Sequence, residues 1–263
     1  MSNVGTTVRH QVAAQSVIET LLRQQEGVPQ RNWLGRLLGD SPLSPDSVAW
    51  YRGALGEIAV GRMLATLPSD WAVFHALPIG KKGADIDHLV VGPGGIITIN
   101  TKNHSGKNVW VGGQTLMVSG HKQPHIRNAD FEAKRVTTLL RQRMPELPAA
   151  LPVVAILDPR QLRIKTKPQQ TTVLSARQLI LWLQKRPPVL TGLQVAALTA
   201  IIQEPGTWPT PPLPPIDNPM ARFTELDGAV RAADLRRRLM AGLRWLAGSA
   251  VVIAFLTAMT NRT

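Results

Sequence analysis

The sequence predicts an α/β fold, in which a mixed β-sheet is flanked by helices and followed by a single C-terminal transmembrane helix. Three observations favour this fold class. Between residues 44 and 203, apolar residues alternate between helical and strand spacing. The resulting order of helix, strand meander, helix and strand is typical of a mixed sheet. Finally, residues 245–260 contain no charged side chain, as expected for a segment inside a bilayer.

Composition limits the classes of protein to which the chain can belong. Its 263 residues, 44% of them hydrophobic, can form one medium domain with appendages or two small domains. Lys and Arg total 30 against 17 Asp and Glu, a net charge of +13. This excess favours a polyanionic partner, either nucleic acid or an anionic membrane, although the charge could serve solubility alone. The absence of cysteine excludes disulfides, thiolate metal sites and thiol nucleophiles.

The first part of the chain, residues 1–43, is an N-terminal extension with one short helical pattern over Val12–Gln25. It lacks the continuous apolar core of a signal peptide. A firmer helix follows, because Ser44 can cap it and the proline at position 45 suits its first turn. Pro68 ends the pattern. Glycines within this helix indicate that another segment packs closely against it.

Short strand patterns follow this helix, and further helices follow the strands. We expect strands over Trp71–Leu77, Ile86–Val91, Ile96–Lys102, Asn108–Val111, Thr115–Ser119, Leu151–Leu157 and Thr172–Leu174. We expect helices over Asn128–Met144, Ala176–Gln184 and Gly192–Gln203. Together with the first helix, these elements predict a domain over residues 44–203.

The C-terminal part changes composition twice. Residues 204–221 are rich in proline, which predicts an extended spacer rather than core; a PxxP-type ligand is the alternative. Residues 222–244 form a basic helical pattern, and residues 245–260 predict one transmembrane helix. Because the Arg cluster precedes this span, the positive-inside rule predicts a single-pass cell-membrane protein with its N-terminal domain in the cytoplasm. The alternatives are a terminal helix packed on the domain and an amphipathic surface helix.

The candidate chemistry lies in the hairpin around the Gly92–Gly95 turn. If Val91 faces Ile96, then Asp87 lies opposite Asn100, and Asp85 lies across from Lys102. Residues two apart in a strand share a face, so Lys102 joins Asn100 on the side of Asp87.

Such a cluster suits hydrolysis of a phosphodiester. Mg²⁺ and Mn²⁺ prefer oxygen ligands, which Asp87 and Asn100 can supply. A lysine at position 102 can orient the attacking water or neutralise charge on the transition-state oxygens. The alternative is a simple salt bridge between Lys102 and one of the hairpin aspartates.

Several other polar residues are weaker candidates. His104 shares the strand face of Lys102 and could line a cleft, whereas His88 points to the opposite face from Asp87 and is expected to be structural. His121 and His125 have helical metal-ligand spacing, but the proline between them argues against that helix. We expect one of them to lie near a phosphate, together with Lys122 and Arg127.

These motifs in combination resemble the nuclease-related domain family, NERD. The resemblance covers residues 50–160 and rests on Gly56-Glu57, Asp85-Ile86-Asp87-His88, Gly92-Pro93-Gly94-Gly95, Asn100-Thr101-Lys102, Gly106–Trp110 and Gly120–Pro124. It implies the PD-(D/E)xK nuclease fold, a restriction-endonuclease-like mixed sheet flanked by helices. It also implies cleavage of DNA with a divalent metal.

The resemblance implies a role for each matching residue. Asp87 would be the main metal ligand, Glu57 would support the metal directly or through water, and Lys102 would be the catalytic lysine. The family's acidic residue two positions before that lysine is here Asn100. An asparagine oxygen can still bind metal, but it brings one negative charge fewer.

The leading hypothesis is therefore a membrane-tethered, cytoplasmic nuclease-like protein, an endonuclease that hydrolyses DNA phosphodiester bonds with Mg²⁺ or Mn²⁺. The second is a catalytically weakened or inactive module of the same fold that binds nucleic acid or another partner at the membrane. A third is a structural membrane protein whose charge serves anionic lipid. Asn100 separates the first two, because the lost carboxylate could reduce activity without affecting binding.

Overall fold

The structure is a computed structural model of the whole chain, and it describes residues 11–29, 31–80, 84–210 and 213–260. Of residues 205 and 243–260 it describes the backbone alone. The chain divides into two compact units. The larger unit comprises residues 1–19 and 50–216, and the smaller comprises residues 20–49 and 217–263. Each unit is described by itself below.

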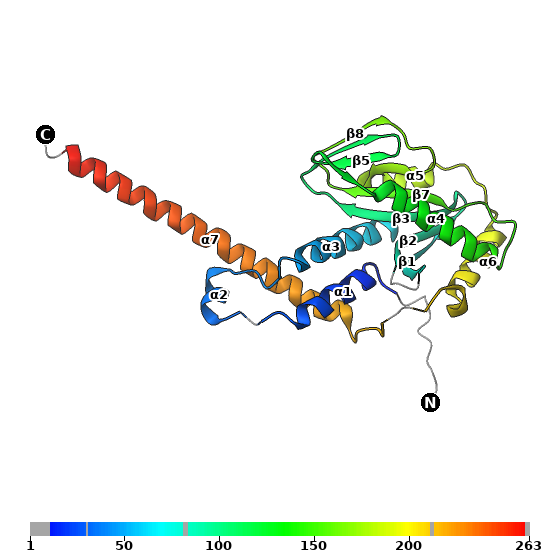
Figure 1. Ribbon diagram of the computed structural model, residues 1–263, viewed down its shortest axis with the longest axis horizontal. Helices are drawn as coiled ribbons and strands as arrows, with labels where there is room; N and C mark the ends of the chain where they lie inside the picture. Colours follow the sequence, from blue (N-terminus) through cyan, green and yellow to red (C-terminus); the bar gives the residue numbers. More distant parts are fainter. Residues whose placement is uncertain (1–10, 30, 81–83, 211–212, 261–263) are drawn as a thin grey trace. The chain divides into compact units, whose positions relative to one another are not determined.

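The larger unit is an α/β domain built around two mixed sheets (Figure 1). Its strands are β1 (Ala72–Pro78), β2 (Asp85–Gly92), β3 (Gly95–Asn103), β4 (Asn108–Gly112), β5 (Thr115–Val118), β6 (His121–Gln123), β7 (Leu151–Leu157), β8 (Gln161–Thr166) and β9 (Thr172–Ser175). Its helical segments are α4 (His125–Arg141), η2 (Ala176–Gln178), α5 (Leu179–Gln184), α6 (Gly192–Gln203) and η3 (Pro205–Thr207), together with most of α3 (Ser47–Leu64).

The five-stranded sheet has the order β1-β2-β3-β7-β9. The hairpins β1–β2 and β2–β3 are antiparallel, whereas β7 pairs parallel to β3 and β9 pairs parallel to β7. Helix α4 makes the crossover between β3 and β7, so that the carboxyl ends of β3 and β7 meet at one edge of the sheet. Ligand sites of mixed α/β sheets commonly lie outside such an edge.

The second sheet has the order β6-β5-β4-β8. Its two edge strands, β6 and β8, were not expected from the sequence. Both consist mainly of polar residues that are exposed to solvent, so neither carries the apolar pattern that reveals a buried strand. Polar edge strands also resist pairing with other chains. The other predicted strands are confirmed by the structure to within two residues at their ends.

Apolar side chains cover both faces of the five-stranded sheet. On one face, Leu89 and Val91 pack with residues of α4 and α6. On the other face, Val90 and Ile97 pack with α3 and α5. The alternation of these neighbouring residues between the two faces follows from the period of a strand. Trp208, in the segment expected to be a spacer, is buried in the first of these clusters, and its indole nitrogen donates to the carbonyl of Ile202.

Two glycines let α3 lie close to its neighbours. A Cβ on Gly56 would lie 3.1 Å from the Cβ of Asn103, at the end of β3. A Cβ on Gly61 would lie 2.6 Å from the Cβ of Ala13. The close packing that these glycines predict is therefore present, and it brings α3 against the edge of the sheet where β3 ends.

This packing yields a stability prediction for a matched pair of substitutions. Gly61→Ala should lower the free energy of unfolding by about 1–3 kcal/mol, because the new methyl overlaps Ala13. Gly53→Ala should raise it by about 1 kcal/mol, because its Cβ would meet only Val17 at 3.6 Å while alanine favours the helix. Urea denaturation of the two variants measures both changes. Equal effects at the two positions would contradict the packing described for α3.

The smaller unit is helical. It includes α2 (Trp33–Leu38), which the sequence analysis did not predict, the end of α1 (Gln15–Glu26), and α7 (Pro219–Thr260). Asn32 caps α2, since its side-chain oxygen accepts from the backbone nitrogen of Gly35 at 2.7 Å. Helix α2 packs on α7, where the guanidinium of Arg236 donates to the carbonyl of Arg36 at 2.8 Å.

The expected transmembrane helix is the part of the predicted fold class that is wrong. No helix among the described residues is long and apolar enough to cross a membrane. In the part of α7 whose side chains are described, Asp227, Asp234 and a run of arginines alternate with apolar residues, and charged groups at membrane depth are costly. The side chains of residues 245–260, on which the expectation rested, lie outside the described residues. The predicted single-pass location is wrong for the same reason, and the described residues give no support for the predicted membrane partner.

Candidate functional site

The hairpin of β2 and β3 has the register that the sequence predicts. Val91 pairs with Ile96 and Leu89 with Thr98, and the recorded pairing stops at His88 and Ile99. Beyond this point the two strands are still joined by a side chain. The Oδ2 atom of Asp87, on β2, accepts from the backbone nitrogen of Thr101, on β3, at 2.6 Å. Asp87 is 9% exposed. A buried carboxylate is therefore fixed at the point where the two strands separate.

Asn100, on β3, contacts a carboxylate that comes from α4. Its side-chain nitrogen donates to both oxygens of Glu132, at 2.7 and 2.9 Å. Asn100 is 5% exposed, and its own side-chain oxygen is buried with no hydrogen-bond partner. The strand position where the resemblance implies an acidic residue is therefore occupied by Asn100, whose amide binds the carboxylate of Glu132.

Glu57 reaches the same region from α3. It is 5% exposed, and burial together with the charges of Asp87 and Asp85 raises its pKa well above its usual range. The position of α3 follows from Gly56, as described above, and from Asn103, whose side-chain nitrogen donates to the carbonyl of Arg52 at 2.8 Å. The contact between α3 and the end of β3 therefore sets how Glu57 lies relative to the strand residues.

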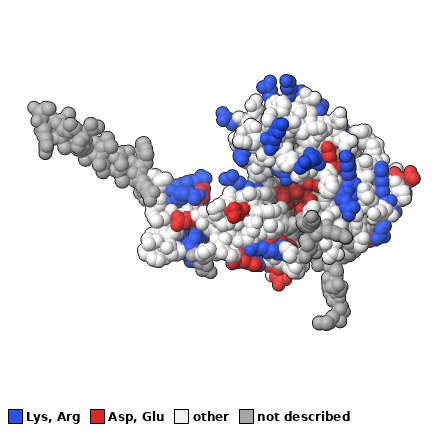
Figure 2. Space-filling model, viewed as in Figure 1, with Lys and Arg blue, Asp and Glu red and all other residues white. Residues whose placement is uncertain are grey.

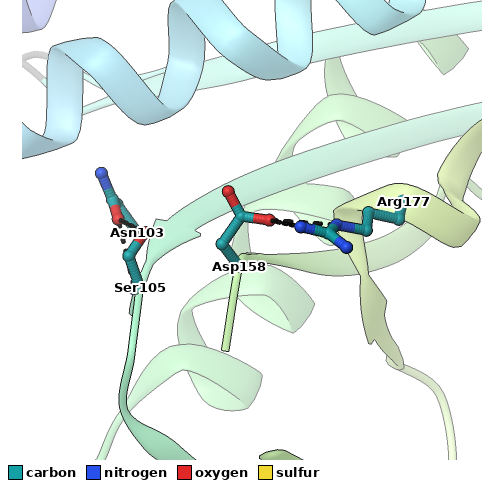
Figure 3. Close-up of polar contacts among 4 residues, drawn as sticks. All are labelled: Asn103, Ser105, Asp158 and Arg177. Carbon is teal, nitrogen blue, oxygen red and sulfur yellow. Dashed lines mark hydrogen bonds and ion pairs between the residues drawn. The ribbon is translucent and has the colours of Figure 1, made fainter. Parts of the chain in front are cut away.

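Further polar contacts organise the loops at this edge of the sheet (Figure 3). The side-chain oxygen of Asn103 accepts from the hydroxyl of Ser105 at 2.7 Å, which stabilises the turn after β3. After β7, Asp158 pairs with the guanidinium of Arg177 at 2.9 Å. The two loops are joined because the backbone nitrogen of Gly106 donates to the carbonyl of Asp158 at 3.0 Å. These contacts hold the segment that follows Lys102.

Lys102 is half-buried on β3, and its charge acts on the surrounding carboxylates without a direct ion pair. Within the described residues it makes no salt bridge to Asp85 or Asp87, so the simple ion pair considered from the sequence is not formed. Burial raises the pKa of Asp87, while Lys102 and the N–H of Thr101 lower it. Burial and Asp87 likewise raise the pKa of Asp85 to about 6, against a smaller lowering by a hydrogen bond from Ser16 and by Lys102.

The pKa of Glu132 is also shifted by burial and by the neighbouring charges. Burial and the charge of Asp87 raise its pKa to about 7, although its hydrogen bond from Asn100 and the charge of Lys102 lower it. Lys102 thus lies among four carboxylates, those of Glu57, Asp85, Asp87 and Glu132, each of which responds to its charge. A cluster of buried acids around one lysine is the arrangement in which functional sites are commonly found.

The histidines form two pairs. His104, which follows β3, lies with its Nε2 3.0 Å from the Nε2 of His125 at the start of α4. Burial lowers the pKa of His104 to about 4 and that of His125 to about 3, so both rings are neutral near pH 7. His88 is fully buried and its Nδ1 lies 2.8 Å from the Nδ1 of His75. His88 therefore lies in the interior, as the sequence pattern predicted.

A pocket of about 380 Å³ opens beside the acidic cluster. Its lining includes Asp85 and Glu132 together with Arg127 and Asn128 from the start of α4. In Figure 2, Asp and Glu side chains gather at one place on the visible face of the larger unit, with Lys and Arg side chains on the surface around them. Lys122 lies exposed on β6 of the other sheet and does not line this pocket.

The donor groups of the cluster fit a hard divalent cation. Within the described residues, no three Asp, Glu or His side chains are gathered closely enough to hold a metal ion by themselves. A cation would therefore need neutral oxygen ligands in addition to the carboxylates, and the unpartnered side-chain oxygen of Asn100 is such a ligand. Mg²⁺ and Mn²⁺ take this mixture of carboxylate, amide and water oxygens. Asp87 and Asn100 are the residues that could bind the ion directly, and Glu57 or Glu132 could add a carboxylate, directly or through water.

The region that contains the acidic cluster matches a known protein family. Residues 52–157 match the model of the nuclease-related domain, NERD. The matched segment contains α3 from Arg52 onward, the β2–β3 hairpin, α4 and β7, and thus every member of the acidic cluster. The match is consistent with the PD-(D/E)xK-like nuclease superfamily. No curated protein and no solved structure matches the chain.

Glu132 is not among the site residues expected from the sequence, although a signal for it exists. The buried residues of α4 include Ala129, Ala133 and Val136. Glu132 lies three residues after the first of these and four before the last, so helical spacing places it on the buried stripe. A carboxylate on the apolar side of an amphipathic helix is costly without a partner, and this conflict marks the position.

Proposed function

We propose that the nuclease-related domain hydrolyses phosphodiester bonds of nucleic acid, with DNA as the substrate and Mg²⁺ or Mn²⁺ as the cofactor. The observation that carries the proposal is the convergence of four half-buried or buried carboxylates and an orphaned amide oxygen around Lys102, at the carboxyl end of a parallel strand pair. Buried acids with raised pKa values repel one another unless a proton or a cation neutralises them. A divalent cation supplies that charge.

In this proposal Asp87 and Asn100 hold the cation from the sheet, and Glu57 supports it from α3. The bound ion would polarise the scissile phosphate and lower the pKa of the attacking water. Lys102 neutralises the charge that develops on the transition-state oxygens, which is the task of a cation held close to the reacting phosphate. Burial and the charges of Asp87 and Asp85 raise the pKa of Glu57, and a cation bound nearby would favour its charged form.

We also propose that positive groups around the pocket hold the nucleic acid backbone. Arg127 lines the pocket beside Glu132, and its guanidinium suits bidentate contact with a phosphate. His104 lies two residues after Lys102, just beyond the end of β3, and would line the path of the backbone as a neutral hydrogen-bonding group. Lys122, on the second sheet, would contribute long-range attraction.

A cleavage assay tests the function. The purified full chain is expected to nick supercoiled plasmid DNA in the presence of Mn²⁺ or Mg²⁺, and to lose this activity when a chelator is added. Because the cluster needs a divalent cation to neutralise its carboxylates, no cleavage is expected in monovalent salt alone. Cleavage that is unaffected by chelation would contradict the metal-dependent mechanism.

The same assay also tests the second candidate function, in which the domain binds nucleic acid without cutting it. The replacement of the family's carboxylate by Asn100 favours this candidate. Its signature would be salt-sensitive DNA binding with no cleavage in any divalent metal, and binding is measured by fluorescence anisotropy across a series of salt concentrations.

A further inference from the structure

The acidic residue expected at position 100 is absent from the strand, but a carboxylate is present beside it. Glu132 comes from α4, 32 residues later in the chain, and the amide nitrogen of Asn100 donates to both of its carboxylate oxygens. The two side chains are therefore held in one fixed arrangement, with the carboxylate beyond the amide. A glutamate at position 100 itself would reach into the same part of the site from the strand.

The surroundings of Glu132 are those of a residue in the site rather than of a helix surface. Its carboxylate is within the electrostatic reach of Asp87, Asp85 and Lys102. It also lines the pocket of about 380 Å³, so a solvent-borne ion can reach it. Arg135, one turn further along α4, donates to the carbonyl of Ile79 at 3.0 Å and does not neutralise it through a salt bridge among the described residues.

The unpartnered oxygen of Asn100 is an independent observation that points to a ligand. One half of this amide is satisfied by Glu132, while its oxygen is buried with no hydrogen-bond partner in the structure. Buried polar atoms are nearly always partnered. If Asn100 served only to bind Glu132, its side-chain oxygen would stay buried without a partner. A cation held between this oxygen and the carboxylates supplies that partner.

We propose that Glu132 is the second acidic ligand of the site, delivered from α4 in place of a strand residue, and that Asn100 positions it while offering its own oxygen to the cation. This proposal rests on the proposed function, since the ligand in question is the divalent ion of that site. It removes the conflict that the sequence raised at Asn100, because the charge missing from β3 is restored from the helix.

The test measures Mn²⁺ binding directly, by electron paramagnetic resonance or calorimetry on the full chain, alongside plasmid cleavage. Glu132→Gln keeps the shape of the side chain and an oxygen that accepts from Asn100, so the fold should persist while the charge is lost. It is expected to weaken Mn²⁺ binding at least ~10-fold. Glu146→Gln, an exposed position just after α4, is the matched control and should leave binding unchanged.

Moving the carboxylate from position 132 to position 100 tests whether Glu132 binds the cation or only stabilises the fold. In the double variant Asn100→Glu with Glu132→Gln, the acid returns to the strand, and Mn²⁺ binding is expected to recover to within ~3-fold of the starting protein. Unchanged binding in Glu132→Gln would overturn the proposal, and so would a loss that the double variant fails to restore although it remains folded by circular dichroism. A starting protein that binds no Mn²⁺ would instead overturn the proposed function.

Discussion

Replacing Lys102 by methionine is expected to lower DNA cleavage by about 10²–10³-fold. Methionine has a similar length and apolar stem, so the packing of β3 should be kept while the charge is removed. The lysine charge acts on Glu57, Asp85, Asp87 and Glu132. Its loss should therefore change the reaction rate more than the affinity for DNA. Measured single-turnover rates and DNA affinities distinguish the two effects.

Asp87→Asn provides the companion measurement. Its amide oxygen can still accept from the backbone nitrogen of Thr101, so the strand ends should remain joined. Mn²⁺ binding should fall with cleavage, because a charged ligand becomes neutral. Asp87→Ala, in contrast, leaves the N–H of Thr101 unpaired and should lower the free energy of unfolding by about 1–3 kcal/mol. Full cleavage by either Lys102→Met or Asp87→Asn would exclude these residues from the mechanism.

Without divalent cations, the domain should become more stable as the pH falls from about 8 to about 6.5. The pKa of Glu132 is raised to about 7 and that of Asp85 to about 6, chiefly by burial. A carboxyl group whose pKa is raised in the folded state stabilises the fold at low pH, and this stabilisation is lost as the pH rises through the raised pKa. Glu132 alone should contribute about 1 kcal/mol over this range.

The histidines limit this effect at lower pH. Burial lowers the pKa of His75 and His104 to about 4, so they favour the fold when neutral. Their contribution is present above the ordinary histidine pKa of 6.5 and is lost as the pH falls from there toward 4. Stability should therefore pass through a maximum on the acid side of neutrality.

Chemical denaturation at several pH values measures this profile, with two variants as controls. Glu132→Gln should flatten the rise between about pH 8 and 6.5, because the titrating group is gone. Glu146→Gln, whose side chain is exposed, should leave the rise unchanged. Saturating Mn²⁺ should oppose the rise, since protons and the cation compete for the same carboxylates. A profile that is identical in the starting protein and Glu132→Gln would contradict the burial of this carboxylate among like charges.

Much of the larger unit could be predicted from local patterns. The hairpin register followed from the Gly92–Gly95 turn and the alternation of apolar residues on either side of it, because a strand period of two allows one pairing that buries them. The same argument placed Asn100 and Lys102 on one side of the strand, and in the structure Asn100 contacts α4 from that side. The edge strands β6 and β8 gave no such pattern, since their polar residues are exposed in the fold.

The sequence by itself determined the mixed sheet, the hairpin, the shared strand side of Asn100 and Lys102 and the resemblance that the family comparison confirms. These features depend on residues close together in the chain, where periodicity and turn chemistry act. Only the tertiary structure decided that Glu132 meets Asn100, because the contact joins residues on separate elements that are brought together by the packing of α4 on β3 and β7. The described helices likewise gave no membrane span. Helical spacing can mark Glu132 as a carboxylate on the buried side of α4, but a contact between distant residues leaves no local period in the sequence, so its partner Asn100 could be found only in the fold.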